Sequence, residues 1–294
     1  MNERALVLGG AGSAGNAWVI GVVAGLFDAG LDVTDADLII GTSSGSTTAA
    51  QLTSAIRPPE LYAATVAAAP PPRRGPGGGR PPHAVGNLLE QTSAIIAAAT
   101  DPADMRRKLG AAALELDATT DSAAQAQRRA LVASRLPSQD WPETLVRIVA
   151  VDAHTGEPVV FDRDSGVGLA DAVTASTSGP GGPPHTIGDH RYIDGGYRAG
   201  ENADLATGYE RVLVLSPFGG RSRTPEEWGL HLATQIDQLR ATGSSVETVF
   251  PAGDAVAIFA LGANQMDPAQ RPPAARAGYD QGRALAAHLT DFWR

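Results

Sequence analysis

A serine between two glycines is the first feature of this sequence that suggests chemistry. Ser43 lies in a Gly-x-Ser-x-Gly motif at residues 41–45, directly after the apolar residues 38–40, and residues 46–52 can continue as a helix. A sharp turn from a strand into a helix holds such a serine exposed, and the helix N-terminus favours nearby negative charge. The pattern is typical of a serine nucleophile, although a serine that only caps the helix gives the same local sequence.

A glycine-rich turn follows the first apolar segment of the chain. Residues 5–8 predict a buried strand, and residues 9–15 form a turn whose backbone N–H groups can face an anion. The turn also contains the Gly-x-Gly-x-x-Gly pattern of dinucleotide sites, which requires an acidic residue at the end of the second strand. The nearby aspartates all precede that strand: Asp32, Asp35 and Asp37. We therefore favour a turn that supplies N–H donors to an oxyanion.

A serine nucleophile needs a base within hydrogen-bond reach. None of the histidines lies in the loop directly after the last predicted strand, where Ser-Asp-His hydrolases carry theirs, and His185 is the candidate among them. Asp194 ends a short predicted strand and precedes two glycines, so its carboxylate can stand exposed, although Asp-Gly is also a common surface turn. The two bases predict different pH profiles, because only an imidazole ordinarily ionises near about pH 6.5.

The composition limits the classes of protein to consider. The chain has 294 residues, of which 43% are hydrophobic, so it can bury a full α/β core. A net charge of −9 gives no support for nucleic acid as a partner. The absence of cysteine excludes disulfides and thiolate ligands, and no ligand spacing suggests a metal. With a short N-terminal apolar segment and no run near the roughly 18 residues of a membrane span, we expect a soluble, cytoplasmic protein.

The middle and the end of the chain predict a loop and several helices. Residues 70–82 contain only proline, glycine and arginine, which predicts an exposed, mobile loop; its arginines could touch anionic head groups, but a solvated loop is the simpler interpretation. Alanine-rich stretches within residues 87–134 predict helices that cover one face of the same domain. Residues 226–242, which contain His231, and residues 271–291 each predict one further helix.

Three motifs in this order resemble the patatin-like phospholipases: the glycine-rich turn, Gly-x-Ser-x-Gly, and Asp-Gly-Gly at residues 194–196. The resemblance extends over nearly all of residues 1–294, and residues 277–283 look like bacterial, actinomycete-type members. It implies a single α/β domain with three α/β/α layers around a central, largely parallel sheet. It also implies a Ser–Asp dyad without histidine, in which Ser43 is the nucleophile and Asp194 the base.

The resemblance further implies that the backbone N–H groups of Gly10, Ala11 and Gly12 form the oxyanion hole. The sequence departs from the family pattern at two positions of this turn. Ala11 replaces a glycine, which would strain a backbone that needs positive φ. Ala14 replaces a basic residue and so removes a charge beside the turn. Trp18 is expected in the core rather than in an acyl pocket.

The sequence therefore predicts a serine acyl-ester hydrolase that acts through an acyl-serine on a phospholipid, a lysophospholipid or another lipid-like ester. An acyltransferase would use the same acyl-serine, with an alcohol or amine in place of water. A non-catalytic lipid-binding or acyl-binding protein would fit the two departures in the turn. No cofactor or metal is implied, peripheral membrane contact suits the substrate class, and the oligomeric state stays open.

Overall fold

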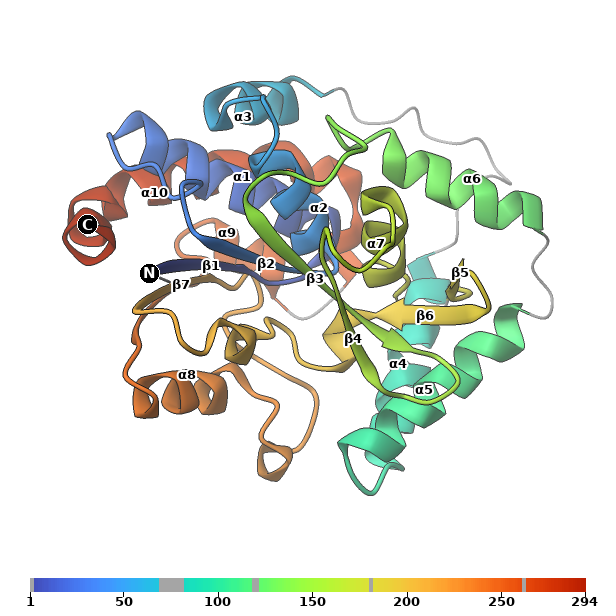
Figure 1. Ribbon diagram of the computed structural model, residues 1–294. Helices are drawn as coiled ribbons and strands as arrows, with labels where there is room; N and C mark the ends of the chain where they lie inside the picture. The colour runs from blue at the N-terminus through green and yellow to red at the C-terminus, as the bar shows by residue number, and fades with distance from the viewer. Residues whose placement is uncertain (1–2, 69–81, 118–121, 180–181, 261–262) are drawn as a thin grey trace.

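A mostly parallel sheet forms the centre of the computed structural model, which describes residues 3–68, 82–117, 122–179, 182–260 and 263–294 (Figure 1). Its strands run in the order β5-β6-β3-β2-β1-β7-β8, with β4 paired to β3. In chain order the strands are β1 (Arg4–Leu8), β2 (Leu38–Thr42), β3 (Leu145–Asp152), β4 (Pro158–Phe161), β5 (His185–Ile187), β6 (His190–Asp194), β7 (Arg211–Leu215) and β8 (Ser245–Val249).

The direction of each strand decides which turns meet. The path β3-β2-β1-β7-β8 is parallel throughout, whereas β4 and β6 run antiparallel to β3, and β5 runs antiparallel to β6. Leu8 at the end of β1 lies opposite Gly41 near the end of β2, and Ala150 of β3 lies opposite Asp194. The turns after β1 and β2 and the end of β6 therefore lie at neighbouring positions along the sheet.

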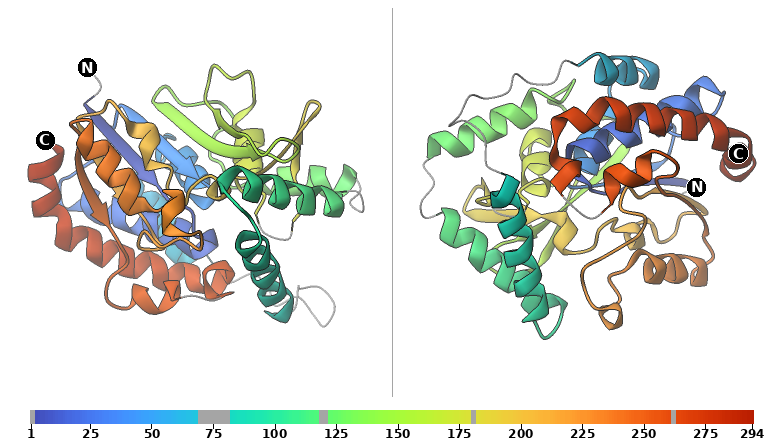
Figure 2. Two further views of the ribbon diagram at one scale, coloured as in Figure 1. Left: turned by 90° about the horizontal axis from the view of Figure 1, so that it is seen from below. Right: turned by 180° about the vertical axis from the view of Figure 1, so that it is seen from behind.

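Helices cover both faces of the sheet. The face of Leu6 and Leu8 is covered by α1 (Gly12–Asp28), α2 (Ser44–Leu52), α3 (Pro58–Ala67), α7 (Leu169–Ser176), α9 (Ala255–Phe259) and α10 (Arg271–Trp293). The side chains that alternate with them, Ala5 and Val7, face α8 (Leu232–Ala241) and the 3-10 turn η2 (Ala203–Ala206). Figures 1 and 2 show α1 and α10 on one face and α8 on the other. The predicted α/β/α fold is thus confirmed.

The helices of residues 82–133 divide between the two faces. α4 (Pro82–Ala97) and α5 (Pro102–Asp117) pack with Ile193 of β6 in one apolar cluster, whereas α6 (Ser122–Ala133) packs against α7 through the opposite core (Figure 1). The prediction that these helices cover a single face is therefore wrong. The predicted loop at residues 70–82 lies, apart from Pro82, outside the described residues.

The helix predicted over residues 226–242 is broken in two. A 3-10 turn, η3 (Glu226–Trp228), ends at Gly229, whose φ of 69° is left-handed, and α8 begins after His231. His231 is thus the N-cap residue of α8 and not an interior helical residue, and its Nε2 lies 2.7 Å from the carbonyl oxygen of Thr224. A glycine that adopts positive φ explains the break, because no helix continues through that conformation.

Helices α1 and α10 touch through their backbones. A Cβ atom on Gly21 would lie 2.1 Å from the carbonyl oxygen of Ala275, and one on Gly282 would lie 2.2 Å from that of Val22. Trp18 is fully buried beside this contact, with its ring 6.2 Å from that of Phe259, as expected of a core residue. Since α1 begins in the glycine-rich turn, this packing fixes the helix on which the turn rests.

We predict that Gly282→Ala lowers the free energy of unfolding by about 1–3 kcal/mol, because the added methyl group forces two helix backbones apart. Gly200→Ala is the matched control, since a Cβ atom there meets nothing within 4 Å. Urea denaturation of both variants gives the comparison. A Gly282→Ala protein as stable as the control would contradict the close helix contact.

Candidate active site

Ser43 adopts a strained backbone conformation between β2 and α2. Its φ of 53° and ψ of −123° are rare for a residue with a side chain. Two hydrogen bonds hold it there: its N–H donates to Ser176 Oγ at 2.9 Å, and its carbonyl oxygen accepts from Ser46 Oγ at 2.6 Å. Ser176, which lies at the end of α7, carries no motif that sequence analysis could detect.

The glycines around Ser43 are required by close contacts. A Cβ atom on Gly41 would lie 2.6 Å from the Cα atom of Ser46, and one on Gly45 would lie 2.0 Å from the carbonyl oxygen of Leu8. A Cβ atom on Gly10 would lie 2.7 Å from the Cβ atom of Ser43. The glycine-rich turn therefore packs directly against the serine.

Ser43 and Asp194 form a hydrogen bond. Ser43 Oγ donates to Asp194 Oδ2 at 2.7 Å, and the N–H of Gly196 donates to Asp194 Oδ1 at 2.8 Å. The N–H of Asp194 donates in turn to the carbonyl oxygen of Ser178 at 2.9 Å. A Cβ atom on Gly195 would lie 2.2 Å from the carbonyl oxygen of Val149 in β3, so the Asp-Gly-Gly turn sits against the sheet. The structure thus brings together the two residues singled out in the sequence.

The carboxyl group of Asp194 is buried, and only 7% of the residue is exposed. Burial raises its pKa to about 6, against the smaller lowering effect of the hydrogen bonds from Ser43 and Gly196. A carboxylate with this pKa titrates in the range of an ordinary imidazole. The prediction that a Ser–Asp pair would show no ionisation near pH 6.5 is therefore wrong, because it assumed an exposed carboxylate.

His185 is bound elsewhere. Its Nε2 lies 2.9 Å from Asp171 Oδ1, and Arg129 donates to both carboxylate oxygens of Asp171. Burial pushes the pKa of Asp171 upward, but the hydrogen bonds from His185 and Arg129 outweigh it and hold that pKa below its ordinary value. Within the described ranges, no histidine side chain forms a hydrogen bond with Ser43 or Asp194.

The expected oxyanion donors differ in whether their N–H groups already have an acceptor. The N–H of Ala11 already donates to Ser44 Oγ at 2.9 Å, and the N–H of Gly10 reaches the carbonyl oxygen of Gly200 at 3.4 Å. Gly12 and Ser44 are the first residues of α1 and α2, and their N–H groups meet no acceptor among the described residues. Ser44 thus has a backbone N–H available for an oxyanion, and its hydroxyl accepts a hydrogen bond from the turn.

The replacement of a glycine by Ala11 causes no backbone strain. Ala11 has a φ of −165°, which is extended backbone that any residue adopts, and Gly12 carries the positive φ of 60°. The expectation of strain at Ala11 is therefore wrong, because the left-handed position falls one residue later. A Cβ atom on Gly12 would also lie 2.4 Å from the sulfur of Met266, which covers this part of the turn.

Asn202 connects the strand that precedes Ser43 with the turn after Asp194. Its Nδ2 donates to Thr42 Oγ1 at 2.9 Å, to the carbonyl oxygen of Ala199 at 2.9 Å and to that of Gly195 at 3.3 Å. Asn202 is fully buried and has a φ of 57°, which asparagine tolerates better than most residues. It therefore fixes the separation between the two halves of the site.

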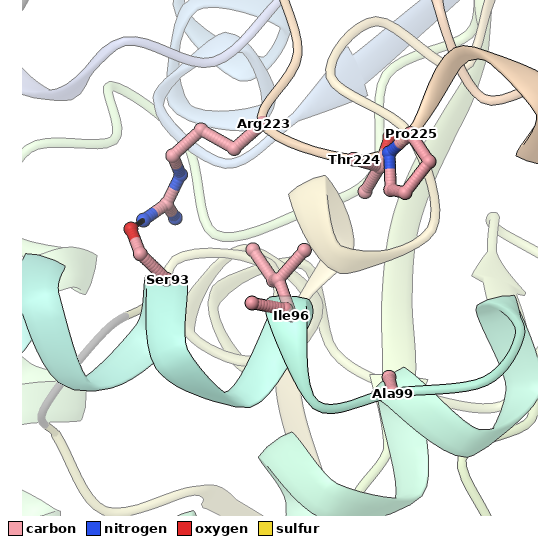
Figure 3. Close-up of a pocket in the computed structure, with 7 residues that line it drawn as sticks. Ser93, Ile96, Ala99, Arg223, Thr224 and Pro225 are labelled. Atoms are coloured by element: carbon pink, nitrogen blue, oxygen red, sulfur yellow. Dashed lines mark hydrogen bonds between the residues drawn. The ribbon is translucent and has the colours of Figure 1, made fainter.

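A cavity of about 360 Å³ lies between the end of α4 and a neighbouring loop (Figure 3). Its walls include Ser93, Ile96, Ala99, Arg223, Thr224 and Pro225. Ile96 belongs to the apolar cluster that also contains Tyr197, and burial and then the charge of Asp194 raise the pKa of the Tyr197 phenol. Tyr197 therefore lies within electrostatic range of both Asp194 and Arg223 of the cavity wall.

The described ranges contain no group of three or more metal-binding side chains placed to hold a metal ion. None of the helices in those ranges combines the length and the hydropathy that crossing a bilayer requires.

We predict that Asp194→Asn raises stability at neutral pH. A pKa of about 6 in the folded protein, against an ordinary value of 3.8, favours folding while the carboxyl is protonated. This contribution is present at low pH and is lost as the pH rises through about 6. The advantage of Asp194→Asn should therefore grow by about 2 kcal/mol between pH 4 and pH 7, at about 1.4 kcal/mol per pKa unit.

Urea denaturation at several pH values measures this difference, with Asp189→Asn, at an exposed position beside β6, as the control. Parallel stability curves for Asp194→Asn and the wild type would contradict a raised pKa at Asp194.

The solved structures that match this chain belong to longer proteins and share little sequence identity with it. VipD from Legionella pneumophila is 13% identical, with 98% of this chain and 67% of that chain covered and a TM-score of 0.44. The type III effector ExoU is 15% identical, with 96% and 54% covered and a TM-score of 0.39. ExoU in complex with SpcU, from Pseudomonas aeruginosa, is 17% identical, with 96% and 53% covered and a TM-score of 0.37. The chain thus spans about half the length of ExoU.

A search among curated proteins found no match. The model of the patatin-like phospholipase family matches residues 6–207, a range that contains the glycine-rich turn, Ser43 and Asp194. The match covers more than half of the chain and agrees with the resemblance seen in its motifs. The chain therefore belongs to the patatin-like phospholipase family.

Proposed function

We propose that this protein is a serine acyl-ester hydrolase that cleaves lipid-like esters through an acyl-Ser43 intermediate, with Asp194 as the base. The observation that carries the proposal is the 2.7 Å hydrogen bond from Ser43 Oγ to a buried carboxylate. The strained turn and the two helix N-termini beside it give further support. The lipid substrate class follows from the family.

In the first half of the reaction, Asp194 Oδ2 accepts the proton of Ser43 Oγ while that oxygen attacks the carbonyl carbon of the ester. The carbonyl oxygen becomes an oxyanion, which the free N–H groups of Gly12 and Ser44 can stabilise. The intermediate then collapses. Its bond to the leaving alcohol breaks, and Asp194 gives its proton to that alcohol.

In the second half, Asp194 removes a proton from a water molecule, and the resulting hydroxide attacks the acyl carbon. The acyl–oxygen bond to Ser43 breaks, Ser43 regains a proton from Asp194, and the carboxylic acid leaves. A pKa of about 6 suits this exchange, because Asp194 is ionised at neutral pH yet more basic than an ordinary carboxylate.

Two other functions use the same site. An acyltransferase would admit an alcohol or amine in place of water. The case for a non-catalytic binding protein depended on a weakened glycine-rich turn. It is less well supported because the backbone of Ala11 is unstrained and the turn can form. We favour hydrolysis because it is the activity that the family implies, and contact with a lipid surface would accompany it.

Replacement of the nucleophile gives the first test. Ser43→Ala should lower kcat for a p-nitrophenyl ester by about 10⁴-fold or more while the fold is kept, since a nucleophile has no substitute in the site. Ser54→Ala, just beyond the end of α2, should retain wild-type kcat. Turnover at the wild-type rate in Ser43→Ala would refute the acyl-serine.

The choice of base gives a second test. Asp194→Asn should lower kcat by about 10³-fold, whereas His185→Ala should stay within about threefold of wild type, because His185 is bonded to Asp171. Both variants are first checked for folding by circular dichroism. An inactive His185→Ala beside an active Asp194→Asn would show that the dyad is the wrong mechanism.

A further inference from the structure

The first residue of α10 reaches back to the glycine-rich turn. Arg271 Nη1 donates to the carbonyl oxygen of Ser13 at 3.0 Å and to Asn16 Oδ1 at 2.9 Å. Ser13 follows Gly12, whose N–H is one of the two donors proposed for the oxyanion. A guanidinium from the far end of the chain thus lies against the turn, although nothing in the local sequence of the turn indicates it.

Asn16 extends this contact to the helix behind the nucleophile. The side chain is buried, and its Nδ2 donates to Thr48 Oγ1 and to Gln51 Oε1 in α2, both at 2.8 Å. Because its Oδ1 accepts from Arg271, every polar atom of the Asn16 side chain is used. Asn16 therefore holds α1 and α2 in one relative position.

Further hydrogen bonds connect Thr48 of α2 back to the glycine-rich turn. Thr48 Oγ1 donates to the carbonyl oxygen of Ser44 at 3.0 Å, and Ser44 Oγ accepts from the N–H of Ala11 at 2.9 Å. The path from Arg271 through Asn16 to Ser44 thus connects the starts of three helices, α10, α1 and α2. Of the two N–H groups proposed for the oxyanion, that of Ser44 belongs to a residue of this path, and that of Gly12 belongs to the residue between Ala11 and Ser13, whose backbones the path binds.

The charge of Arg271 is not neutralised by a carboxylate of the described residues. Its contacts are a carbonyl and an amide oxygen. Burial lowers the pKa of Arg271, and the nearby Arg135 lowers it further, but a guanidinium stays protonated at neutral pH. A partly buried cation without an anionic partner is costly. Here it lies where two helix N-termini already favour negative charge.

We propose that Arg271 is a positioning residue of the hydrolytic reaction: its guanidinium fixes the glycine-rich turn relative to Ser43 through Asn16, and adds positive potential where the oxyanion forms. This inference rests on the proposed function. Arg271 lies outside residues 6–207, and the turn itself carries no cation, since Ala14 occupies it. The charge comes from the C-terminal helix instead.

The test measures kcat and KM for a p-nitrophenyl ester in three variants. Arg271→Gln should lower kcat by about 10–100-fold with KM within twofold, because the donors are misplaced only for the transition state. Arg271→Lys keeps the charge and should lose about 3–10-fold. Arg276→Gln, at an exposed position of the same helix, should match wild type.

Wild-type kcat in a folded Arg271→Gln protein, or a loss confined to KM, would overturn the inference. If Arg271→Gln does not fold, Arg271→Lys decides: a reduced kcat at constant KM supports it, and wild-type kcat overturns it. An active Ser43→Ala would instead refute the proposed function, so the two failures are distinguishable.

A double-mutant cycle tests the path through Asn16. If Arg271 acts through Asn16, then Asn16→Ala combined with Arg271→Gln should reduce kcat little more than the worse single variant does. Losses that multiply would show that Arg271 acts independently of Asn16 and would overturn the positioning role.

Discussion

The hydrogen bond between Ser43 and Asp194 depends on the order of three adjacent strands. Ser43 directly follows the end of β2, and β3 pairs with β2. β6 runs antiparallel to β3, and Asp194 is its last residue. β3 extends to Asp152, beyond the end of β2, and β6 pairs with this extension so that Asp194 lies opposite Ala150. Since Val149, the neighbour of Ala150, lies opposite Thr42, this register allows two residues 151 positions apart to form a hydrogen bond.

Both partners are held in states that an isolated chain would avoid. Ser43 keeps a positive φ because Ser176 and Ser46 bind its backbone. The Asp194 carboxyl is buried with hydrogen bonds but, among the residues that the structure describes, without a cationic partner. Such features destabilise the fold locally and are typical of functional sites. They also give Asp194 the basicity that its proposed role requires.

The sequence predicted the parts of the site that local motifs encode. Ser43 and Asp194 each lie in a short glycine-containing motif beside a strand, and adjacent strands bring such motifs together. Contacts between distant segments could not be predicted. The bond from Ala11 to Ser44 depends on how α1 packs on α2, and the contact of Arg271 with the turn depends on how α10 packs on α1. The burial that raises the pKa of Asp194 depends on the whole core. The break at Gly229 was missed because a lone glycine also occurs inside helices.

Covalent labelling with a fluorophosphonate tests the central claim most directly, because the nucleophile displaces fluoride from phosphorus and keeps the label. Peptide mass spectrometry should locate the label on Ser43. Its rate should rise with pH through about 6, the pKa of Asp194, and should fall sharply in Asp194→Asn. A label on another residue, or labelling of Ser43 at the same rate in Asp194→Asn, would contradict the account.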